Sequence, residues 1–487
     1  MLEFSKKKIS DIKADMAVLF ACEDMAPYEQ DDAGKIVKRS LEYTEFAGKA
    51  EKEIMFYDLS GMTSERVLVC GLGRAEDVDA EVLRAAAGRA VKKAISMKLS
   101  SIAICVPGID FENSKESASR PVMEGACLAN QCINDFREKK EDKALAKIII
   151  CTESDAGADE GLAKLVSTIC NGTMLARTWV SMPSNEKRPD RFARMIKKAA
   201  SSDAIKVRVL DEKELKEEGM NAILAVGAGS SRKPRMVILE YRPDGRKQHV
   251  ALVGKGVTFD SGGINLKSAS GIANMKMDMS GAAAAAASVI TAARIGIPCW
   301  ITAVIPIVEN MPSGNATRPG DIIKTYSGKT VEIDNTDAEG RLILADALAY
   351  AEKNYEPDII FDIATLTGAC MVALGEKIAG LFCHDDDLAG RMLDSANRTH
   401  ERCWRMPLPM DYKKLLKSDF ADIKNISSSS YGGAITGALF LNEFVQTDKW
   451  CHIDIAGPAY SKKGGDYTIP GGTGFGVRLL VDFLEGI

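Results

Sequence analysis

The chain has 487 residues, of which 46% are hydrophobic and 27% charged, and its formal net charge is -5. This length exceeds one ordinary hydrophobic core, so we expect two domains, and the composition is typical of a soluble globular protein. The negative charge gives no electrostatic reason to expect nucleic acid as the main partner, because nucleic-acid binding depends on basic surface.

Cysteine usage and the N-terminal residues predict the cellular compartment of the protein. The twelve cysteines are scattered with no CxxC pair, which is typical of a reducing environment rather than a disulfide framework. Residues 1–8, MLEFSKKK, lack the apolar core of a secretion signal. The alanine-rich residues 281–308 are interrupted by Arg294 and Pro298, so we interpret them as a buried helix and a strand rather than a membrane span. We expect a cytoplasmic protein with no membrane partner.

The first part of the sequence alternates apolar strand-like runs with a helical pattern. Leu83, Ala86, Ala87 and Val91 recur at helical spacing and predict a helix over residues 82–97. Strands alternating with helices predict a mostly parallel sheet. The predicted strands are residues 16–20, 66–70, 101–106 and 147–151.

A domain boundary is predicted near residue 160. Residues 154–161 are polar and turn-rich, and a long helix-like stretch follows them. We therefore expect an N-terminal α/β domain at residues 1–160, a connecting helix at 161–180 and a C-terminal domain at 181–487, which the motifs described below identify as the catalytic domain.

Three apolar runs of the second part end in polar or glycine-rich loops. They are residues 250–253, 358–361 and 451–455, and a fourth loop of this kind spans residues 335–341. Parallel strands bring their carboxyl ends to the same edge of a sheet, which is where α/β proteins bind ligands. We therefore expect the four loops to meet at one edge of one sheet.

The segment at residues 335–342 reads NTDAEGRL and joins an alternating strand pattern to an apolar helical run. Its acids, Asp337 and Glu339, would converge and repel one another, and a divalent cation with its preference for oxygen ligands relieves that repulsion. The alternative is a helix N-terminus that attracts acids, which explains only one of the two.

Residues 254–267 read GKGVTFDSGGINLK and contain Lys255, Asp260 and Lys267. The glycines allow a close backbone approach to a ligand, and Asp260 is a candidate oxygen ligand. A lysine buried beside a cation has a lowered pKa, so it can ligate metal when neutral or polarise a carbonyl when charged. Taken alone, the stretch fits a phosphate-binding loop equally well, although the P-loop pattern is absent.

The remaining candidates are Asp278, in MKMDMSG, and Arg341. Asp278 is either a metal ligand or a solvated acid near a helix that Ser280 could cap. Arg341 either forms a salt bridge or binds a small anion. None of the four histidines forms a zinc pair, so a metal site would be rich in carboxylates, which suits magnesium, manganese or zinc. Four carboxylates suit two divalent ions, an arrangement that activates water for hydrolysis.

At these residues the chain resembles the leucyl aminopeptidase family, also called cytosol aminopeptidases. The resemblance rests on residues 335–342, 255–267 and 275–281, and covers the chain from about residue 176 to its end. It continues through residues 311–314, 318–321, 364–369 and 454–457. The first part matches only in general character, as is usual for the variable N-terminal domain of this family.

The resemblance implies a two-domain α/β fold. The smaller N-terminal domain would be macro-like, and the larger catalytic domain would have a mixed, mostly parallel central sheet flanked by helices. It also implies a homohexamer that hydrolyses the N-terminal peptide bond of peptides and prefers leucine-like residues.

The resemblance further implies two divalent ions, Mn²⁺ or Zn²⁺ and possibly Mg²⁺. Lys267 would polarise the scissile carbonyl, and Arg341 would hold a bicarbonate that acts as general base. Lys255 must then be neutral to ligate metal, whereas Lys267 must be charged to stabilise an oxyanion. One ion would be held by Lys255, Asp260, Asp278 and Glu339, and the other by Asp260, Asp337 and Glu339.

By the same resemblance, the side-chain pocket is walled by Met275, Thr365, Gly368 and Ala456. Backbone groups of Leu366 and Gly368 would hold the main chain of the substrate. Two alternatives stay open. A two-metal phosphoesterase would need the carboxylates but neither the lysine pair nor Asp278, and a DNA-binding protein would need a basic surface that the acidic balance argues against.

Overall fold

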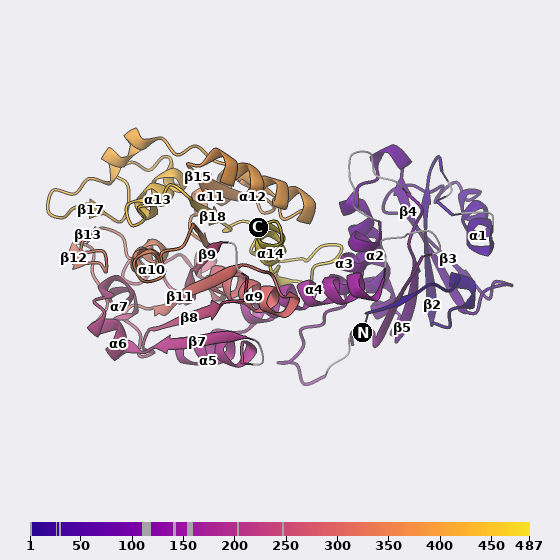
Figure 1. Ribbon diagram of the computed structural model, residues 1–487, viewed down its shortest axis with the longest axis horizontal. Helices are drawn as coiled ribbons and strands as arrows, with labels where there is room; N and C mark the ends of the chain where they lie inside the picture. The colour runs from indigo at the N-terminus through magenta and orange to yellow at the C-terminus, as the bar shows by residue number, and fades with distance from the viewer. Residues whose placement is uncertain are drawn as a thin grey trace. The chain divides into compact units, whose positions relative to one another are not determined.

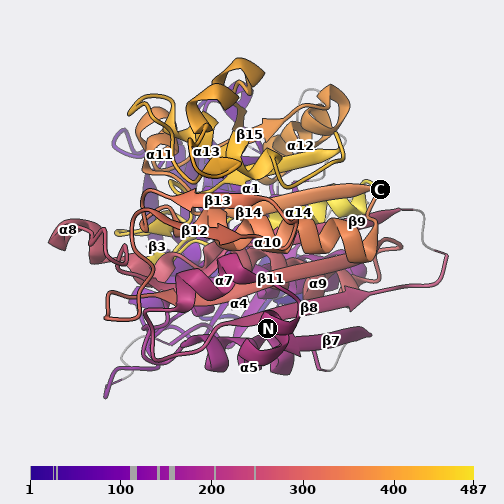
Figure 2. The same ribbon diagram turned by 90° about the vertical axis from the view of Figure 1, so that its left-hand side faces the viewer.

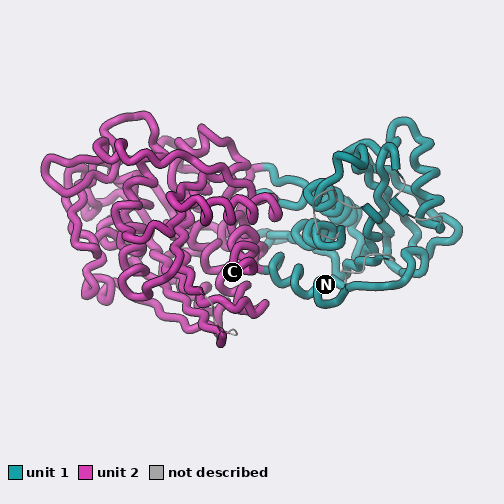
Figure 3. Tube along the Cα trace, turned by 45° about the horizontal axis from the view of Figure 1, so that its top comes forward, with its two compact units in different colours: residues 1–171, 463–470 teal, residues 172–462, 471–487 magenta. Residues whose placement is uncertain are grey.

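The computed structural model describes residues 2–25, 27–28, 31–109, 118–139, 143–152, 159–201, 204–245 and 248–487. The chain divides into two compact units, which Figure 3 distinguishes by colour. The N-terminal unit comprises residues 1–171 and 463–470, and the C-terminal unit comprises residues 172–462 and 471–487. The division falls inside helix α4 (Glu160–Ser181). The polar segment expected at the domain boundary lies mostly outside the described residues.

The N-terminal unit is built on a six-stranded sheet in the order β1-β6-β5-β2-β4-β3, in which β3 alone runs antiparallel to its neighbour. Figure 1 labels β2, β3, β4 and β5 of this sheet together with the helices α1, α2 and α3. All four predicted strands and the predicted helix of this part are confirmed. The elements are β1 (Leu2–Ser5), β2 (Met16–Cys22), β3 (Glu53–Tyr57), β4 (Arg66–Gly73), β5 (Ser101–Cys105), β6 (Lys147–Cys151), α1 (Asp32–Leu41), α2 (Ala80–Ser96) and α3 (Ser119–Ala129), with short 3-10 turns at Ile9–Asp11 and Ala75–Asp77.

Strand β2 shows why this sheet needs helices on both faces. Every residue of β2 is buried, and successive side chains of a strand point to opposite faces. Met16, Val18 and Phe20 belong to one core cluster with α2 and α3, whereas Ala17 and Leu19 belong to another with α1. A continuous apolar run is therefore required here, as in parallel sheets that are covered on both sides.

The C-terminal unit contains a nine-stranded sheet in the order β16-β15-β18-β14-β9-β11-β8-β7, with β10 paired to β11. Its central pairs are parallel, whereas β7, β8 and β15 pair antiparallel with their inner neighbours. The two-domain α/β class with a mixed, mostly parallel sheet is confirmed. The strands are β7 (Ile205–Leu210), β8 (Arg235–Tyr241), β9 (His249–Gly254), β10 (Gly256–Asp260), β11 (Trp300–Asn310), β14 (Ile359–Ala364), β15 (Ala379–Cys383), β16 (Cys403–Arg405) and β18 (Trp450–Asp454).

Helices flank this sheet, and Figure 2 views it with α7 and α10 toward the reader. Side chains of α7, α10 and α13 share one core cluster with β9, β11 and β14. The alanine-rich residues 281–308 form the buried helix α9 and most of strand β11, as expected. Among the described residues no helix is both long and apolar enough to cross a membrane. The helices are α5 (Pro189–Ala199), α6 (Glu212–Glu217), α7 (Asn221–Gly227), α8 (Ala269–Ile272), α9 (Ser280–Ile295), α10 (Glu339–Tyr355), α11 (Gly368–Leu374), α12 (Asp386–Thr399), α13 (Gly433–Asn442) and α14 (Val477–Glu485), with 3-10 turns η3 (Met275–Met277) and η4 (Met410–Leu416).

The strand before the NTDAEGRL segment corrects one expectation. It is β13 (Thr330–Ile333), which lies in a separate three-stranded sheet between β12 (Asp321–Lys324) and β17 (Ile423–Lys424). The short connection at residues 325–329 favours pairing of β13 with the preceding strand as a hairpin. The loops after β9, β14 and β18 do share one edge of one sheet, but the expectation was wrong for the loop after β13. A two-stranded sheet, β19 (Tyr460–Ser461) and β20 (Gly471–Gly472), completes the unit.

Candidate active site

A cavity of about 440 Å³ opens where β9, β10, β14 and β18 end. All of the predicted site residues except Arg341 line it. The lining residues that the sequence predicted are Lys255, Asp260, Lys267, Met275, Asp278, Asp337, Glu339, Thr365, Leu366, Gly368 and Ala456.

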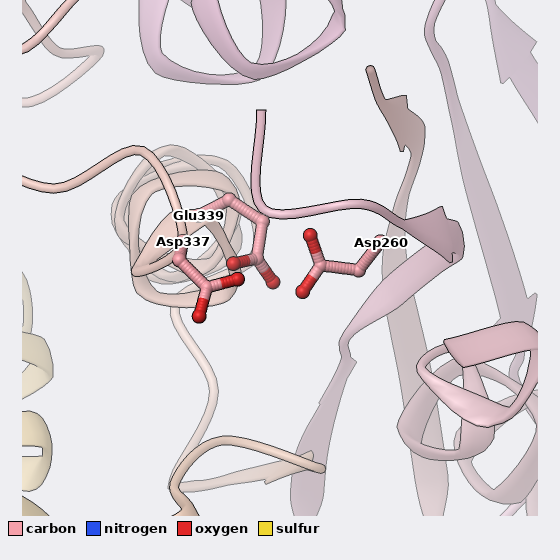
Figure 4. A group of neighbouring side chains, drawn as sticks. All are labelled: Asp260, Asp337 and Glu339. Atoms are coloured by element: carbon pink, nitrogen blue, oxygen red, sulfur yellow. The ribbon is translucent and has the colours of Figure 1, made fainter. Parts of the chain in front are cut away.

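Three carboxylates form the acidic centre of this cavity. Asp260 ends β10, Asp337 lies in the loop after β13, and Glu339 is the first residue of α10. One carboxylate oxygen from each lies within 4.8 Å of the others, and Figure 4 shows the three side chains gathered around a common space. Burial and the charge of Glu339 raise the pKa of Asp260, and burial and Asp260 raise the pKa of Asp337. Cations are needed to keep all three ionised together.

Lys255 lies between β9 and β10, in the innermost part of the site. Its Nζ lies 2.8 Å from Asp278 Oδ1 and 2.9 Å from Glu339 Oε1, and it donates a 2.8 Å hydrogen bond to the carbonyl of Thr365. Burial acts to lower the pKa of Lys255, but the charges of Asp278 and Glu339 outweigh it and raise that pKa. The predicted neutral amine concerns a site loaded with metal, where cations would counter these charges, and it stays a prediction.

A glycine makes room for the Lys255 side chain. A Cβ added to Gly340, the second residue of α10, would lie 2.5 Å from Cε of Lys255 and 2.7 Å from its Nζ. Real Cβ atoms essentially never approach a non-bonded heavy atom so closely, so the lysine would have to shift. A side chain at this glycine of the NTDAEGRL segment would thus displace the lysine of a loop that lies 85 residues earlier in the chain.

Lys267 approaches the same carboxylates from the open side of the cavity. Its Nζ lies 2.8 Å from Asp260 Oδ2 and 2.5 Å from Asp337 Oδ1. Burial acts to lower the pKa of Lys267, but Asp260 and then Glu339 raise it above its ordinary value. The charged state expected for this lysine also concerns a site loaded with metal, and it stays a prediction.

Asp278 presents an oxygen that the protein does not satisfy. It directly follows η3, and its Oδ1 accepts a 2.7 Å hydrogen bond from the hydroxyl of Thr365. Its Oδ2 is buried without a hydrogen-bond partner, and burial raises the pKa of Asp278 well above its usual value. A buried oxygen of this kind needs a donor or a cation. Ser280 does not cap α9 as expected, because it lies inside the helix and its hydroxyl donates to the Met277 carbonyl.

Asn310, at the end of β11, is a site residue that sequence reasoning missed. Its amide donates to Asp260 Oδ1 at 2.8 Å and to the Thr336 carbonyl at 3.0 Å. It therefore fixes a carboxylate and the loop after β13 relative to each other. A polar residue that closes a long apolar strand was the available signal.

Arg341 is buried in the first turn of α10 but is not part of the cavity wall. Its Nη1 donates a 2.8 Å hydrogen bond to the carbonyl of Asn425, and its Nε is buried without a partner. Burial lowers the pKa of Arg341 to about 10, against the raising effect of Glu339 and Asp454. Within the described part of the chain it forms no salt bridge.

The cavity is lined by apolar as well as acidic side chains. Met277 and Met371 line it together with the predicted Met275, so three methionines contribute to its wall. Methionine side chains are flexible and fill irregular gaps, so this wall can adapt to occupants of different shape. Sequence reasoning missed Ser268, Gly271, Met277, Thr367 and Met371 as lining residues.

Comparison with known proteins agrees with this geometry. Residues 174–481 match the model of the cytosol aminopeptidase family, catalytic domain, and residues 22–140 match that of its N-terminal domain. The chain belongs to the cytosol aminopeptidase family. Family membership supports an aminopeptidase, a hydrolase of peptide bonds, over the phosphoesterase alternative.

Individual relatives span almost the whole chain. A probable cytosol aminopeptidase of Chlorobaculum tepidum is 42% identical over 481 residues, covering 93% of this chain and 94% of the relative. One from Aquifex aeolicus is 41% identical, with 98% and 97% covered. Among solved structures, the bottromycin maturation enzyme BotP in complex with Mn has a TM-score of 0.86 at 33% identity, with 97% of this chain and 99% of that chain covered.

Proposed function

We propose that this chain is a two-metal aminopeptidase that hydrolyses the N-terminal peptide bond of peptides and prefers leucine-like residues. One observation carries the proposal: five residues from three separate segments, with an unpartnered buried oxygen on Asp278, converge at one cavity. They are Lys255, Asp260, Asp278, Asp337 and Glu339.

The donor set fits two divalent cations. Lys255, Asp260, Asp278 and Glu339 would hold one, and Asp260, Asp337 and Glu339 the other. When bound, such ions polarise a carbonyl and lower the pKa of water so that it becomes a nucleophile at neutral pH. The ligands suit Mn²⁺, Zn²⁺ or Mg²⁺, and the Mn complex of BotP supports Mn²⁺.

The residues of the chain supply the rest of the chemistry. The ammonium group of Lys267 is placed on the open side, where it would stabilise the negative charge that develops on the peptide carbonyl. The free amine of the substrate would lie near Asp278, which would restrict cleavage to N-terminal residues. The partnerless Nε of Arg341 is a donor that suits a small oxyanion, and we propose bicarbonate there as the general base.

The walls of the cavity support a preference for apolar side chains. Met275, Thr365, Gly368 and Ala456 would enclose the side chain of the N-terminal residue, and the backbones of Leu366 and Gly368 would hold its main chain. We further propose a cytoplasmic homohexamer that acts on peptides and does not have nucleic acid as its main partner.

The decisive experiment combines metal analysis with hydrolysis of chromogenic anilides. We expect two divalent ions per subunit after incubation with Mn²⁺ or Zn²⁺, and hydrolysis of leucine anilide faster than arginine anilide. A phosphate ester serves as the control substrate, since a two-metal phosphoesterase would cleave it. Protein that holds two ions but cleaves neither anilide would refute the proposal.

A further inference from the structure

Asp454, the last residue of β18, is fully buried and accepts four hydrogen bonds with its two carboxylate oxygens. Its Oδ1 accepts from the backbone amides of Leu366 and Ala456, both at 3.1 Å. Its Oδ2 accepts from the amide of Thr367 at 3.1 Å and from the Thr367 hydroxyl at 2.7 Å. All three donor residues line the cavity, although Asp454 itself does not.

These bonds fix two walls of the cavity against each other. Leu366 and Thr367 lie in the loop after β14, whereas Ala456 lies in the loop after β18. The two strands are parallel neighbours, and Ala364 pairs with Asp454 at the point where both end. The last backbone hydrogen bond between the two chain segments is donated by the Ile455 amide to the Ala364 carbonyl. Beyond it, the carboxylate of Asp454 joins the two loops.

The bonds to Asp454 also set the direction of carbonyl groups. In a trans peptide the carbonyl of one residue and the amide hydrogen of the next point in opposite directions. The Leu366 amide points to Asp454, so the Thr365 carbonyl points away from it, where it accepts the hydrogen bond from Lys255. By the same geometry the Thr367 amide turns the Leu366 carbonyl away from Asp454.

We propose that Asp454 is the positioning residue that fixes the substrate-binding walls of the cavity and the direction of their main-chain carbonyls. The inference rests on the proposed aminopeptidase function. It assigns to Asp454 no contact with the substrate or with a metal.

Asp454→Asn tests this directly. An amide has one acceptor oxygen, so its NH₂ group would face two of the donors that the carboxylate now satisfies. We expect kcat/KM for leucine anilide to fall by about 100-fold, the effect of a small misplacement of substrate, with a larger change in KM than in kcat. Two ions should still bind at saturating metal, because every carboxylate ligand is unchanged.

Asp362→Asn is the matched control. Asp362 lies in β14, opposite His452 of β18, and it too is fully buried. Its oxygens accept from Trp450 Nε1 at 2.8 Å and contact His452 Nδ1 at 2.5 Å, and neither partner lines the cavity. Asp362→Asn should lower thermal stability while leaving KM near that of the parent enzyme. An equal rise of KM in both variants would overturn the proposal, because it would show a merely structural effect.

A measurement without substrate separates this inference from the proposed function. Hydrogen exchange of the Leu366 and Thr367 amides should accelerate at least tenfold in Asp454→Asn and stay unchanged in Asp362→Asn, as expected for amides that lose their acceptor. Unchanged exchange in Asp454→Asn would overturn the role of Asp454 even if the enzyme is active. If the parent protein cleaves no peptide, the proposed function fails, but the exchange result still decides what Asp454 holds in place.

A second pair of variants serves if Asp454→Asn does not fold. Thr367→Val removes the hydroxyl bond to Asp454, whereas Thr367→Ser keeps it. We expect a several-fold rise of KM in the valine variant and near-parental KM in the serine variant. Equal KM values for both would contradict the proposal.

Discussion

The two lysines of the cavity, Lys255 and Lys267, each contact two carboxylates, but their surroundings differ. The side chains of the inner group, Lys255, Asp278 and Glu339, are 4%, 6% and 2% exposed. The ammonium group of Lys255 forms ion pairs with both carboxylates and donates a hydrogen bond to the Thr365 carbonyl. Removing one member of such a buried group leaves charge uncompensated, which is costly.

The outer group is open on one side. Lys267 is 17% exposed and its partner Asp337 33%, although Asp260 is buried. Water or a substrate can therefore replace one partner of Lys267 without leaving a buried charge unpaired. The difference indicates that the inner group is built to hold a fixed arrangement, whereas the outer group can respond to a substrate whose charge changes during the reaction.

The largest effect should come from Lys255→Arg. Arginine does not lose its proton in proteins, so it cannot ligate metal, and its bulky guanidinium would stay among the carboxylates. We expect loss of one metal ion per subunit and a fall of kcat/KM by more than about 10³-fold. Metal analysis and anilide hydrolysis check both, with Lys267→Arg as the comparison that should keep two ions. Two ions and full activity in Lys255→Arg would show that the inner lysine is no ligand.

Lys267→Met should reduce catalysis without loss of metal. Removing a donor that stabilises an oxyanion typically lowers kcat by about 10² to 10³-fold. We expect a loss of that size in kcat for leucine anilide, two bound ions, and partial recovery in Lys267→Arg. A variant that lost metal instead would erase the proposed distinction between the two groups.

Asn310→Ala tests how far the outer group depends on the hydrogen bond from Asn310 to Asp260. Removing a hydrogen-bond partner of a ligating carboxylate typically weakens metal binding by about 10 to 100-fold. Calorimetric titration of metal-free protein with Mn²⁺ should show a loss in that range, with activity restored at high metal concentration. Asn315→Ala, in the exposed loop that follows, is the control and should bind Mn²⁺ like the parent. Equal affinity in both variants would contradict the role of Asn310.

The candidate ligands could be read from the sequence because each lies at a recognisable element end. Lys255 follows an apolar strand, and Glu339 opens a helix. Asn310 and Asp454 also end strands, but their roles could not be recognised, because the groups that they hold lie 50 and 88 residues away in the chain. Their roles follow from strand order, which a single sequence does not specify.

Two of the expectations from the sequence were wrong for local physical reasons. The loop after β13 was placed at the edge of the main sheet, but a short hairpin pairs β13 with β12 instead. Ser280 was expected as a cap, yet α9 already includes it and Met279 precedes the helix without a side-chain cap. Periodicity identified these elements, but it did not identify their partners or their first residues.

The smallest effect should come from Gly340→Ala. The added Cβ would meet Cε and Nζ of Lys255, and the enclosed lysine has little space to move aside. Crowding of this kind costs roughly 1 to 3 kcal/mol, so we expect about tenfold weaker metal binding with a displaced Lys255. Gly390→Ala is the control, because a Cβ added to that helical glycine of α12 would meet no atom within 4 Å and alanine favours helix there. If Gly340→Ala bound metal like the control, the inner group would be more adaptable than its burial indicates, and the contrast with the outer group would weaken.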